Sequence, residues 1–205
     1  PCLLIFGHGY TANAFVDYIR NIDWEIFGTT RNSQTADLLI KKGVKPLMWS
    51  DGSKIKSVIN RADYILHSIP PTEIGDPVYK RFSKAIMSRS TNLSWFGYLS
   101  TTSVYGNHDG EWVDENIPVN PSSNRGLLRV KAENNWSNIK DLPLHIFRLA
   151  GIYGPNRSPL DKIRSGKAQL ISKPGQFFSR IHVEDIARVL KASIEMPSHG
   201  SVYNV

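Results

Sequence analysis

The alternation of short apolar segments with segments of helical periodicity constrains the fold of this chain more than any other feature. Six segments rich in β-branched and aromatic residues read as strands: 2–6, 24–30, 44–49, 63–69, 95–101 and 144–150. Apolar residues at helical spacing predict helices at 11–20, 33–42, 53–61, 78–90, 125–138 and 183–195. Short apolar strands separated by helices are typical of a parallel sheet that helices cover on both faces. The sequence therefore predicts an α/β fold with a doubly wound parallel sheet.

Composition limits the class of protein. The 205 residues, of which 40% are hydrophobic and 21% charged, suit one compact domain spanning 1–205. No window reaches the roughly 18 apolar residues of a membrane helix, and none resembles a secretory signal. The single cysteine, Cys2, cannot form an internal disulfide. We therefore expect a cytoplasmic protein with no membrane partner.

The net charge of +7 favours anionic partners. Lys and Arg are scattered rather than clustered, so we expect a phosphate-bearing cofactor or substrate and no nucleic acid. The chain begins at Pro1 and stops directly after "GSVYNV", which reads as a strand. We therefore expect a C-terminal substrate-covering part to be short or missing.

The first strand leads into "IFGHGYTANAF", in which Gly7, Gly9 and Ala12 form a G-x-G-x-x-A pattern at the start of a helix. In this pattern the first glycine allows a tight turn, and the second lets the backbone approach a pyrophosphate. The helix N-terminus, with Tyr10 and Thr11, then offers amide donors to the anion. A purely structural glycine turn is the alternative, but the strand–turn–helix context favours a dinucleotide site.

The end of the second predicted strand bears on the choice of dinucleotide. An NAD site normally has an acidic residue there, whereas "GTTRN" places Arg31 at this point. Arg31 favours the 2′-phosphate of NADP, although it is also compatible with an ordinary solvated arginine. Asp51, just after the third strand, is expected either to hold the adenine edge or to cap a helix.

Later stretches complete a resemblance to a known family. The chain resembles the NAD-dependent epimerase/dehydratase family, the extended and atypical short-chain dehydrogenase/reductases. The matching stretches follow the family's order: "GHGYTA" (7–12), "ADYILH" (62–67), "STTSVYG" (100–106), "FRLAGIYGP" (147–155) and "RIHVEDIA" (180–187). The resemblance implies an NAD(P)-binding Rossmann fold, with Ser68 and the backbone around Gly151 close to the cofactor.

The resemblance also implies a catalytic hydroxyl. The family's strand ending in S-[ST]-x-x-V-Y-G carries a catalytic Ser or Thr three residues before the valine, which is Thr101 here. This hydroxyl would hydrogen-bond the substrate oxygen during hydride transfer. The alternative is a β-branched residue that simply ends a strand. Tyr105, in the same motif, is expected to form a wall of the substrate site.

The charged row "RGLLRVKAE" departs from the family pattern. The family's Y-x-x-x-K pair, with a glutamate four residues after the lysine, falls on Arg125, Arg129 and Glu133. Arg129 would take over part of the lysine's work as a catalytic residue beside the nicotinamide ribose. Arg125 cannot replace the tyrosine, because a guanidinium stays protonated. The helix would instead present both arginines to a substrate carboxylate or phosphate, or both would face water.

The substrate half of the family pattern is incomplete. Tyr153 and Arg180 are candidates for substrate binding, but the family's arginine four residues before the histidine is Phe178 here. His182 is expected to be a hydrogen-bonded structural residue near a helix start. The six histidines show no zinc spacing, so we expect no metal.

Together these features predict an NADP-preferring oxidoreductase, with NAD as the alternative cofactor. It would be an atypical epimerase/dehydratase that acts on a small hydroxyl, carbonyl or sugar-derived substrate, and a homodimer is a possible assembly. The competing hypothesis is a non-catalytic sensor of dinucleotide redox state or of a ligand.

Overall fold

The predicted parallel sheet is present in the computed structural model, which describes residues 1–167, 175 and 177–205. Its strands run in the order β3-β2-β1-β4-β5-β6-β9, and each neighbouring pair is parallel. The C-terminal strand joins the six predicted ones, with these bounds: β1 (Cys2–Phe6), β2 (Glu25–Thr30), β3 (Lys45–Met48), β4 (Tyr64–His67), β5 (Trp95–Thr101), β6 (Leu144–Leu149) and β9 (Val202–Asn204). The doubly wound fold is confirmed.

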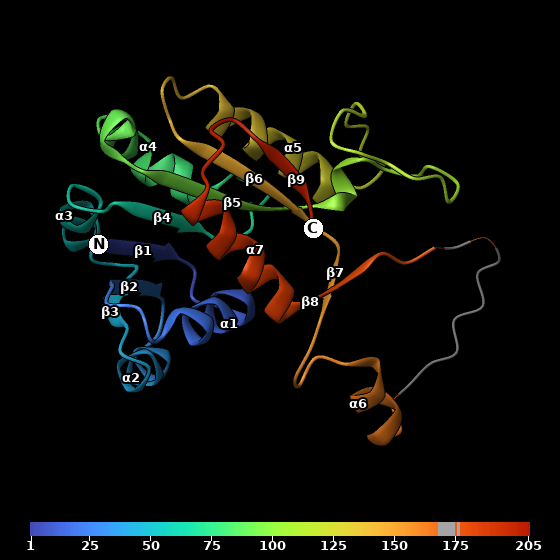
Figure 1. Ribbon diagram of the computed structural model, residues 1–205, viewed down its shortest axis with the longest axis horizontal. Helices are drawn as coiled ribbons and strands as arrows, with labels where there is room; N and C mark the ends of the chain where they lie inside the picture. Colours follow the sequence, from blue (N-terminus) through green and yellow to red (C-terminus); the bar gives the residue numbers. More distant parts are fainter. Residues whose placement is uncertain (168–174, 176) are drawn as a thin grey trace.

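Helices cover both faces of this sheet (Figure 1). One apolar core lies between the sheet and α1 (Tyr10–Ile19), α2 (Ser33–Lys41) and α7 (Val183–Glu195). The other lies between the sheet and α3 (Gly52–Ile59), α4 (Pro77–Met87) and α5 (Asn124–Ser137). Since both faces are buried, the strands are apolar throughout, as their sequences predict. No helix within the described ranges is long and apolar enough to span a membrane.

Side chains define where most helices begin. Asn32, Asp51, Asp76, Ser123 and His182 each accept a hydrogen bond from a backbone N–H in the first turn of the helix that follows. Such caps satisfy amides that have no partner inside the helix. Helix α1 differs, because Gly9 is its N-cap and provides no side-chain acceptor. The first amides of α1 are therefore left for another partner at the end of β1.

Several short elements were not predicted. Strands β7 (Gly151–Tyr153) and β8 (Arg180–His182) form a separate two-stranded sheet, and α6 (Pro159–Arg164) lies between them in sequence. In Figure 1 these elements extend away from the main sheet. Two 3-10 turns, Ser90–Asn92 and Thr102–Val104, flank β5. Segments of three residues are too short to show a period, which explains why the sequence pattern missed them.

Candidate functional site

The strand order reverses between β1 and β4, which places the glycine turn at the point where doubly wound sheets usually bind ligands. Gly7 has φ +83°, and a Cβ there would lie 2.5 Å from Cγ1 of Ile69. Gly9 is the opposite case, since a Cβ on it would meet no atom of the described residues within 4 Å. The turn is therefore tightly packed at Gly7 and open at Gly9. Ala12 is fully buried where α1 packs on the sheet.

Two clefts border this turn, and a third adjoins them through shared lining residues. The central cleft, of about 420 Å³, is lined by segments 9–11, 99–103 and 149–152 together with Ser68, Arg125, Arg129 and Arg157. The outer cleft, of about 500 Å³, is lined mainly by segments 7–9, 29–32 and 68–70. The side cleft, of about 500 Å³, is lined by segment 70–73 and by Asn124, Arg125, Leu128 and Arg129. Gly9 and Ser68 border the first two, and the two arginines of α5 border the first and third.

Thr101 ends β5 at the edge of the central cleft. Its Oγ1 lies 3.1 Å from Oγ of Ser103 and accepts a hydrogen bond from the Ser103 amide at 3.3 Å. The hydroxyl therefore caps the following 3-10 turn while it faces the cleft. A threonine hydroxyl has one proton to donate and two lone pairs, so the cap leaves a further interaction available.

Helix α5 reaches the central cleft because of a close approach at Gly126. A Cβ on Gly126 would lie 2.5 Å from the carbonyl oxygen of Ser103 and 2.7 Å from Cβ of Pro121. Only a glycine allows the helix to pack this tightly against the turn after β5. This contact brings Arg125 and Arg129 to the same cleft as Thr101. Sequence reasoning did not single out Gly126, although it lies inside the charged row.

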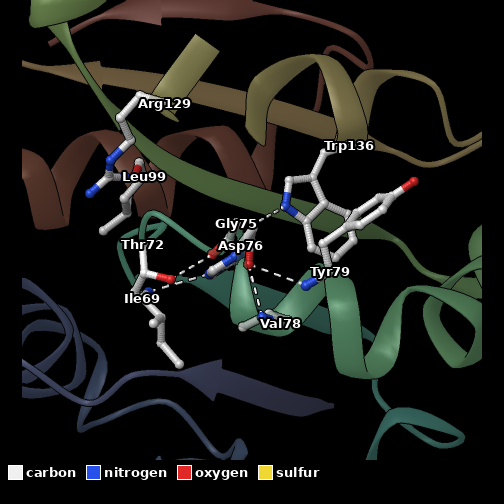
Figure 2. Close-up of polar contacts among 10 residues, drawn as sticks. Ile69, Thr72, Gly75, Asp76, Val78, Tyr79, Leu99, Arg129 and Trp136 are labelled. Carbon is white, nitrogen blue, oxygen red and sulfur yellow. Dashed lines mark hydrogen bonds and ion pairs between the residues drawn. The ribbon is translucent and has the colours of Figure 1, made fainter. Parts of the chain in front are cut away.

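The charged row of α5 is only partly solvated. Arg129 is 7% exposed, and its Nη1 donates to the carbonyl oxygen of Leu99 on β5, as Figure 2 shows. Its guanidinium also lies 5.9 Å from the ring centroid of Tyr98. Arg125 is exposed at the mouth of the cleft. The expectation that both arginines face water is therefore wrong for Arg129.

Glu133 is buried at 4% exposure and belongs to a different network. Its carboxylate accepts from Nη2 of Arg148 on β6 at 2.8 Å, and from the hydroxyl of Ser100. Arg148 donates in turn to the hydroxyl of Tyr105 at 2.8 Å, which donates to Oδ1 of Asn204 at 2.7 Å. This chain of bonds joins α5, β6 and β9 beneath the cleft.

The same network corrects the expectation for Tyr105. Its side chain is 2% exposed and does not line the central cleft, because its hydroxyl is drawn toward Arg148 and Asn204. Tyr105 is thus a buried structural residue just after β5 and does not form a wall of the central cleft.

The segment after β4 is anchored by a buried polar group (Figure 2). Nδ1 of His67 accepts from the Ile69 amide at 3.3 Å, so its proton lies on Nε2, which donates to Oδ2 of Asp76 at 2.8 Å. Nε1 of Trp136 donates to the same oxygen at 2.8 Å, and Oδ1 caps α4. Asp76 therefore ties the ends of β4, α4 and α5 together.

These bonds also act on the acidity of Asp76. Burial alone would raise the pKa of the carboxyl, but the adjacent His67 and the donated hydrogen bonds hold the pKa below its usual range. Sequence reasoning missed this group, since its members are far apart along the chain. The segment 68–73 that it anchors lines all three clefts.

Arg31 lines the outer cleft, and Asp51 does not. Arg31 is exposed at the end of β2 and lines this cleft beside Thr29, Thr30 and Thr35. Asp51 lines none of the three clefts, because its Oδ1 caps α3 through the Lys54 amide at 3.1 Å. Of the two roles expected for Asp51, the structure has it in the helix cap.

The segment after β6 presents different side chains from those expected. Gly151 lines the central cleft, whereas the ring of Tyr153 meets the ring of His182 edge to face, with centroids 5.1 Å apart, and Arg180 lies over the ring of Phe178. Neither Tyr153 nor Arg180 lines any of these three clefts, although both belong to the short β7–β8 sheet whose first residue, Gly151, does.

Arg157 contributes a charge to the central cleft that sequence reasoning missed. Its guanidinium lies 5.5 Å from the ring centroid of Tyr10, whose hydroxyl donates to the carbonyl oxygen of Pro155 at 2.9 Å. Arg157 follows the recognised "FRLAGIYGP" stretch by two residues, so inspection of that loop for cations would have found it. No cluster of metal-ligating side chains occurs among the residues that the structure describes.

Comparisons with known proteins agree with this geometry. A structure of a functionally unknown conserved protein from Silicibacter pomeroyi DSS is 46% identical, with a TM-score of 0.91, and the match covers 100% of this chain and 71% of that one. Protein YeeZ of Escherichia coli (strain K12) is 24% identical over 98% of this chain and 76% of its own length. The dTDP-glucose 4,6-dehydratase of Bacillus anthracis, solved in complex with NAD, shares the fold at 18% identity and a TM-score of 0.79, over 100% of this chain and 74% of its own.

The family comparison covers almost the whole sequence. The model of the NAD dependent epimerase/dehydratase family matches residues 3–205, which include the glycine turn, Thr101 and the charged row of α5. The chain belongs to the NAD dependent epimerase/dehydratase family.

Proposed function

We propose that this protein is an atypical oxidoreductase of its family that binds NADP, with NAD as the alternative, and acts on a hydroxyl or carbonyl group of a small, sugar-like substrate. The observation that carries the proposal is the shared cleft. The open glycine turn, the Thr101 hydroxyl and the guanidinium of Arg129 all border the central cleft. A dinucleotide that begins in the outer cleft and crosses Gly9 would end beside Thr101.

The residues around the glycine turn fit a dinucleotide. In the part of the chain that the structure describes, no atom lies within 4 Å of a Cβ on Gly9 and no side chain caps the first amides of α1, so backbone donors face an open space. A helix N-terminus with free amides favours a phosphate group. Arg157, beside Tyr10, adds a positive charge at the same place. We assign the pyrophosphate to this part of the cleft.

Arg31 supports NADP over NAD. No acidic residue follows β2 at the place where an NAD site would bind the ribose hydroxyls, and Arg31 lines the outer cleft there. None of the ion pairs in the described ranges involves Arg31. Its guanidinium is therefore available to a 2′-phosphate, which it would bind through charge-assisted hydrogen bonds.

The bound cofactor would accept or give the hydride. Thr101 would donate its hydroxyl proton in a hydrogen bond to the substrate oxygen and so orient the reacting carbon. Arg129 would place a fixed positive charge beside this oxygen, which stabilises negative charge as it develops. The bond from Arg129 to Leu99 holds the guanidinium in position before the substrate arrives. The proton that the substrate oxygen loses or gains in this step would exchange with solvent through the open cleft, because neither arginine of α5 can serve as a proton shuttle at neutral pH.

Calorimetry and turnover measurements test the proposal. We expect NADP to bind more tightly than NAD, and Thr101→Ala to lower turnover about 100-fold or more, the usual contribution of a positioned hydrogen-bonding group. Thr101→Ser is the matched control, since it keeps the hydroxyl and the cap of the 3-10 turn. Absence of binding by both dinucleotides would refute the cofactor assignment. Turnover unchanged in Thr101→Ala would refute the role of the hydroxyl.

One observation favours a second candidate function, a non-catalytic dinucleotide sensor. Arg125 occupies the place of the family's tyrosine acid, and the one phenol in the described lining of the central cleft, that of Tyr10, lies at the glycine turn and donates to the carbonyl of Pro155. A sensor would bind dinucleotide with similar affinity but turn over none of the sugars and carbonyl compounds offered with it. A screen for absorbance change at the nicotinamide band separates the two functions.

A further inference from the structure

We propose that the substrate carries an anionic group, a carboxylate or a phosphate, which Arg125 and Arg129 bind where the central and side clefts meet. The inference rests on the proposed function, because it takes the central cleft to be the place of reaction. It adds the chemical class of the substrate.

The first argument is the buried charge of Arg129. The side chain is 7% exposed and permanently protonated, yet its hydrogen-bond partner in the described part of the chain is a neutral carbonyl. No carboxylate among the described residues forms an ion pair with Arg129 or Arg125. A buried cation without a counter-ion is costly, so an anion that enters the cleft would be strongly favoured.

The second argument is the sign of the charge around the cleft. Three arginines line the central cleft, and its described lining includes no acidic residue. The nearest carboxylate along α5, on Glu133, is already bound by Arg148 and Ser100. In the side cleft the one acidic residue of the described lining is Glu73, which is exposed to solvent. The electrostatic potential at the junction of the two clefts is therefore positive, and the low dielectric of the cleft walls strengthens it.

The third argument is the position of the two guanidinium groups. Arg125 and Arg129 are four residues apart and so lie on the same face of α5. Both line the central cleft, which contains Thr101, and both line the side cleft, which the segment 70–73 closes on its other side. An anion held between them would lie beside the reacting end of the central cleft. The rest of the substrate would extend into the side cleft.

The three arginines of the central cleft then divide into one that binds the cofactor pyrophosphate and two that bind the substrate anion. Arg157 lies over Tyr10, next to the glycine turn, where the pyrophosphate is assigned. Arg125 and Arg129 come from α5 and border the side cleft, which Arg157 does not line. Loss of Arg125 should therefore lower the affinity for the substrate anion and leave the affinity for the cofactor unchanged. Loss of Arg157 should lower the affinity for the cofactor and leave the affinity for the substrate anion unchanged.

The test uses three probes with the same sugar ring: glucuronate, glucose 6-phosphate and glucose. Each is titrated by calorimetry into the full chain at constant ionic strength, with and without saturating NADP. We expect one of the two anions to bind at least about tenfold more tightly than glucose, and Arg125→Gln to remove this difference. The preferred anion identifies the source as a carboxylate or a phosphate. Lys131→Gln, which removes a positive charge from an exposed position on the same helix, is the matched control and should bind as the unmodified chain does.

Side-chain NMR of the arginine Nε–H groups supplies a second measurement that does not depend on turnover. The favoured anion should shift the Arg125 and Arg129 signals, and glucose should not. Equal binding of glucose and both anions, or an unchanged preference in Arg125→Gln, would overturn the inference. Dinucleotide affinity, measured without sugar in the same variants, keeps the two proposals separate. If neither dinucleotide binds, the proposed function fails, while the titrations without NADP still decide the anion site.

Discussion

Glu133 lies one turn beyond Arg129 on α5, yet its carboxylate pairs with Arg148, on β6, at a distance of 2.8 Å. A pair between Glu133 and Arg129 would have neutralised the buried charge beside the cleft. Glu133 instead neutralises the charge of Arg148 on β6. Arg129 is left with a hydrogen bond to the neutral carbonyl of Leu99. The charge of Arg129 thus stays available at the cleft. Glu133 and Arg148 thus form a structural ion pair, while the Arg129 guanidinium has no carboxylate partner among the described residues. The first two predictions follow from this difference.

The substitution Glu133→Ala should lower the free energy of unfolding by about 3 to 5 kcal/mol, because it leaves the buried Arg148 without its counter-ion. Urea titration measures the loss. Arg188→Ala, which breaks an exposed pair with Asp185, is the control and should cost about 1 kcal/mol or less. Equal losses of unfolding free energy in the two variants would show that the buried pair stabilises the fold no more than an exposed pair does.

The substitution Arg129→Ala should weaken dinucleotide binding about tenfold, as expected for one lost charge-assisted hydrogen bond to the ribose. Calorimetry with NADP measures the change. Arg129→Lys keeps the charge and should lose less affinity. Lys131→Ala, on the same helix but outside the clefts, should have no effect. Affinity unchanged in Arg129→Ala would remove this side chain from the cofactor site.

The substitution Asp76→Asn should lower the free energy of unfolding by about 3 kcal/mol. Four donors point at the carboxylate, and the amide nitrogen of asparagine would meet some of them with its own N–H groups. Urea titration again provides the measurement. Asp51→Asn alters a cap of the same kind on α3 at a partly exposed position, and should cost at most about 1 kcal/mol. A loss of 1 kcal/mol or less in Asp76→Asn would contradict the role of the buried group.

These predictions depend on contacts that the sequence pattern could reveal only in part. The strands and helices of the sheet were predictable because their signal is local: apolar runs, periodicity and the glycine turn all lie within a few residues. The partner of Glu133 is 15 positions away on strand β6, and Trp136 is 60 positions from Asp76. Such pairings depend on how the elements pack, so no local pattern identifies them. The resemblance to a family predicted that Thr101 and Arg129 belong to one site. It could not predict that the Tyr105 hydroxyl points toward Arg148 and Asn204, because that orientation depends on long-range contacts.

The substitution Arg31→Ala tests the choice between the two dinucleotides. NADP affinity should fall by about tenfold or more, since the 2′-phosphate would lose its guanidinium, and NAD affinity should stay the same. Calorimetry with both dinucleotides measures the two responses. Arg20→Ala, an exposed change at the end of α1 outside the outer cleft, is the control for loss of general positive charge. Equal effects on NADP and NAD would exclude a bond from Arg31 to the 2′-phosphate.

Stability should fall as the pH is lowered from about 6.5 toward 4, because of two buried histidines. Nε2 of His145 accepts from the Ser198 amide at 3.0 Å, and Nδ1 lies 3.0 Å from the carbonyl of Pro143, so the neutral ring satisfies both contacts. Burial, with the nearby His199, lowers the pKa of His145 from 6.5 to about 4. Burial, with the nearby Lys42, also lowers the pKa of His8 to about 4.

Within this pH window the unfolded chain binds protons at His145 and His8 that the folded chain excludes, so acidification favours unfolding. The stabilisation is complete above about pH 6.5, and the loss amounts to about 3 kcal/mol per histidine at the low end. Urea titrations at intervals from pH 7.5 to 4.5 should show the fall, and His145→Phe should reduce its slope even if it lowers stability at every pH. Nitrogen-15 shifts of the His145 ring should identify the tautomer protonated on Nδ1. A slope that His145→Phe leaves unchanged, or a ring already charged at pH 6, would refute this account of the buried histidine.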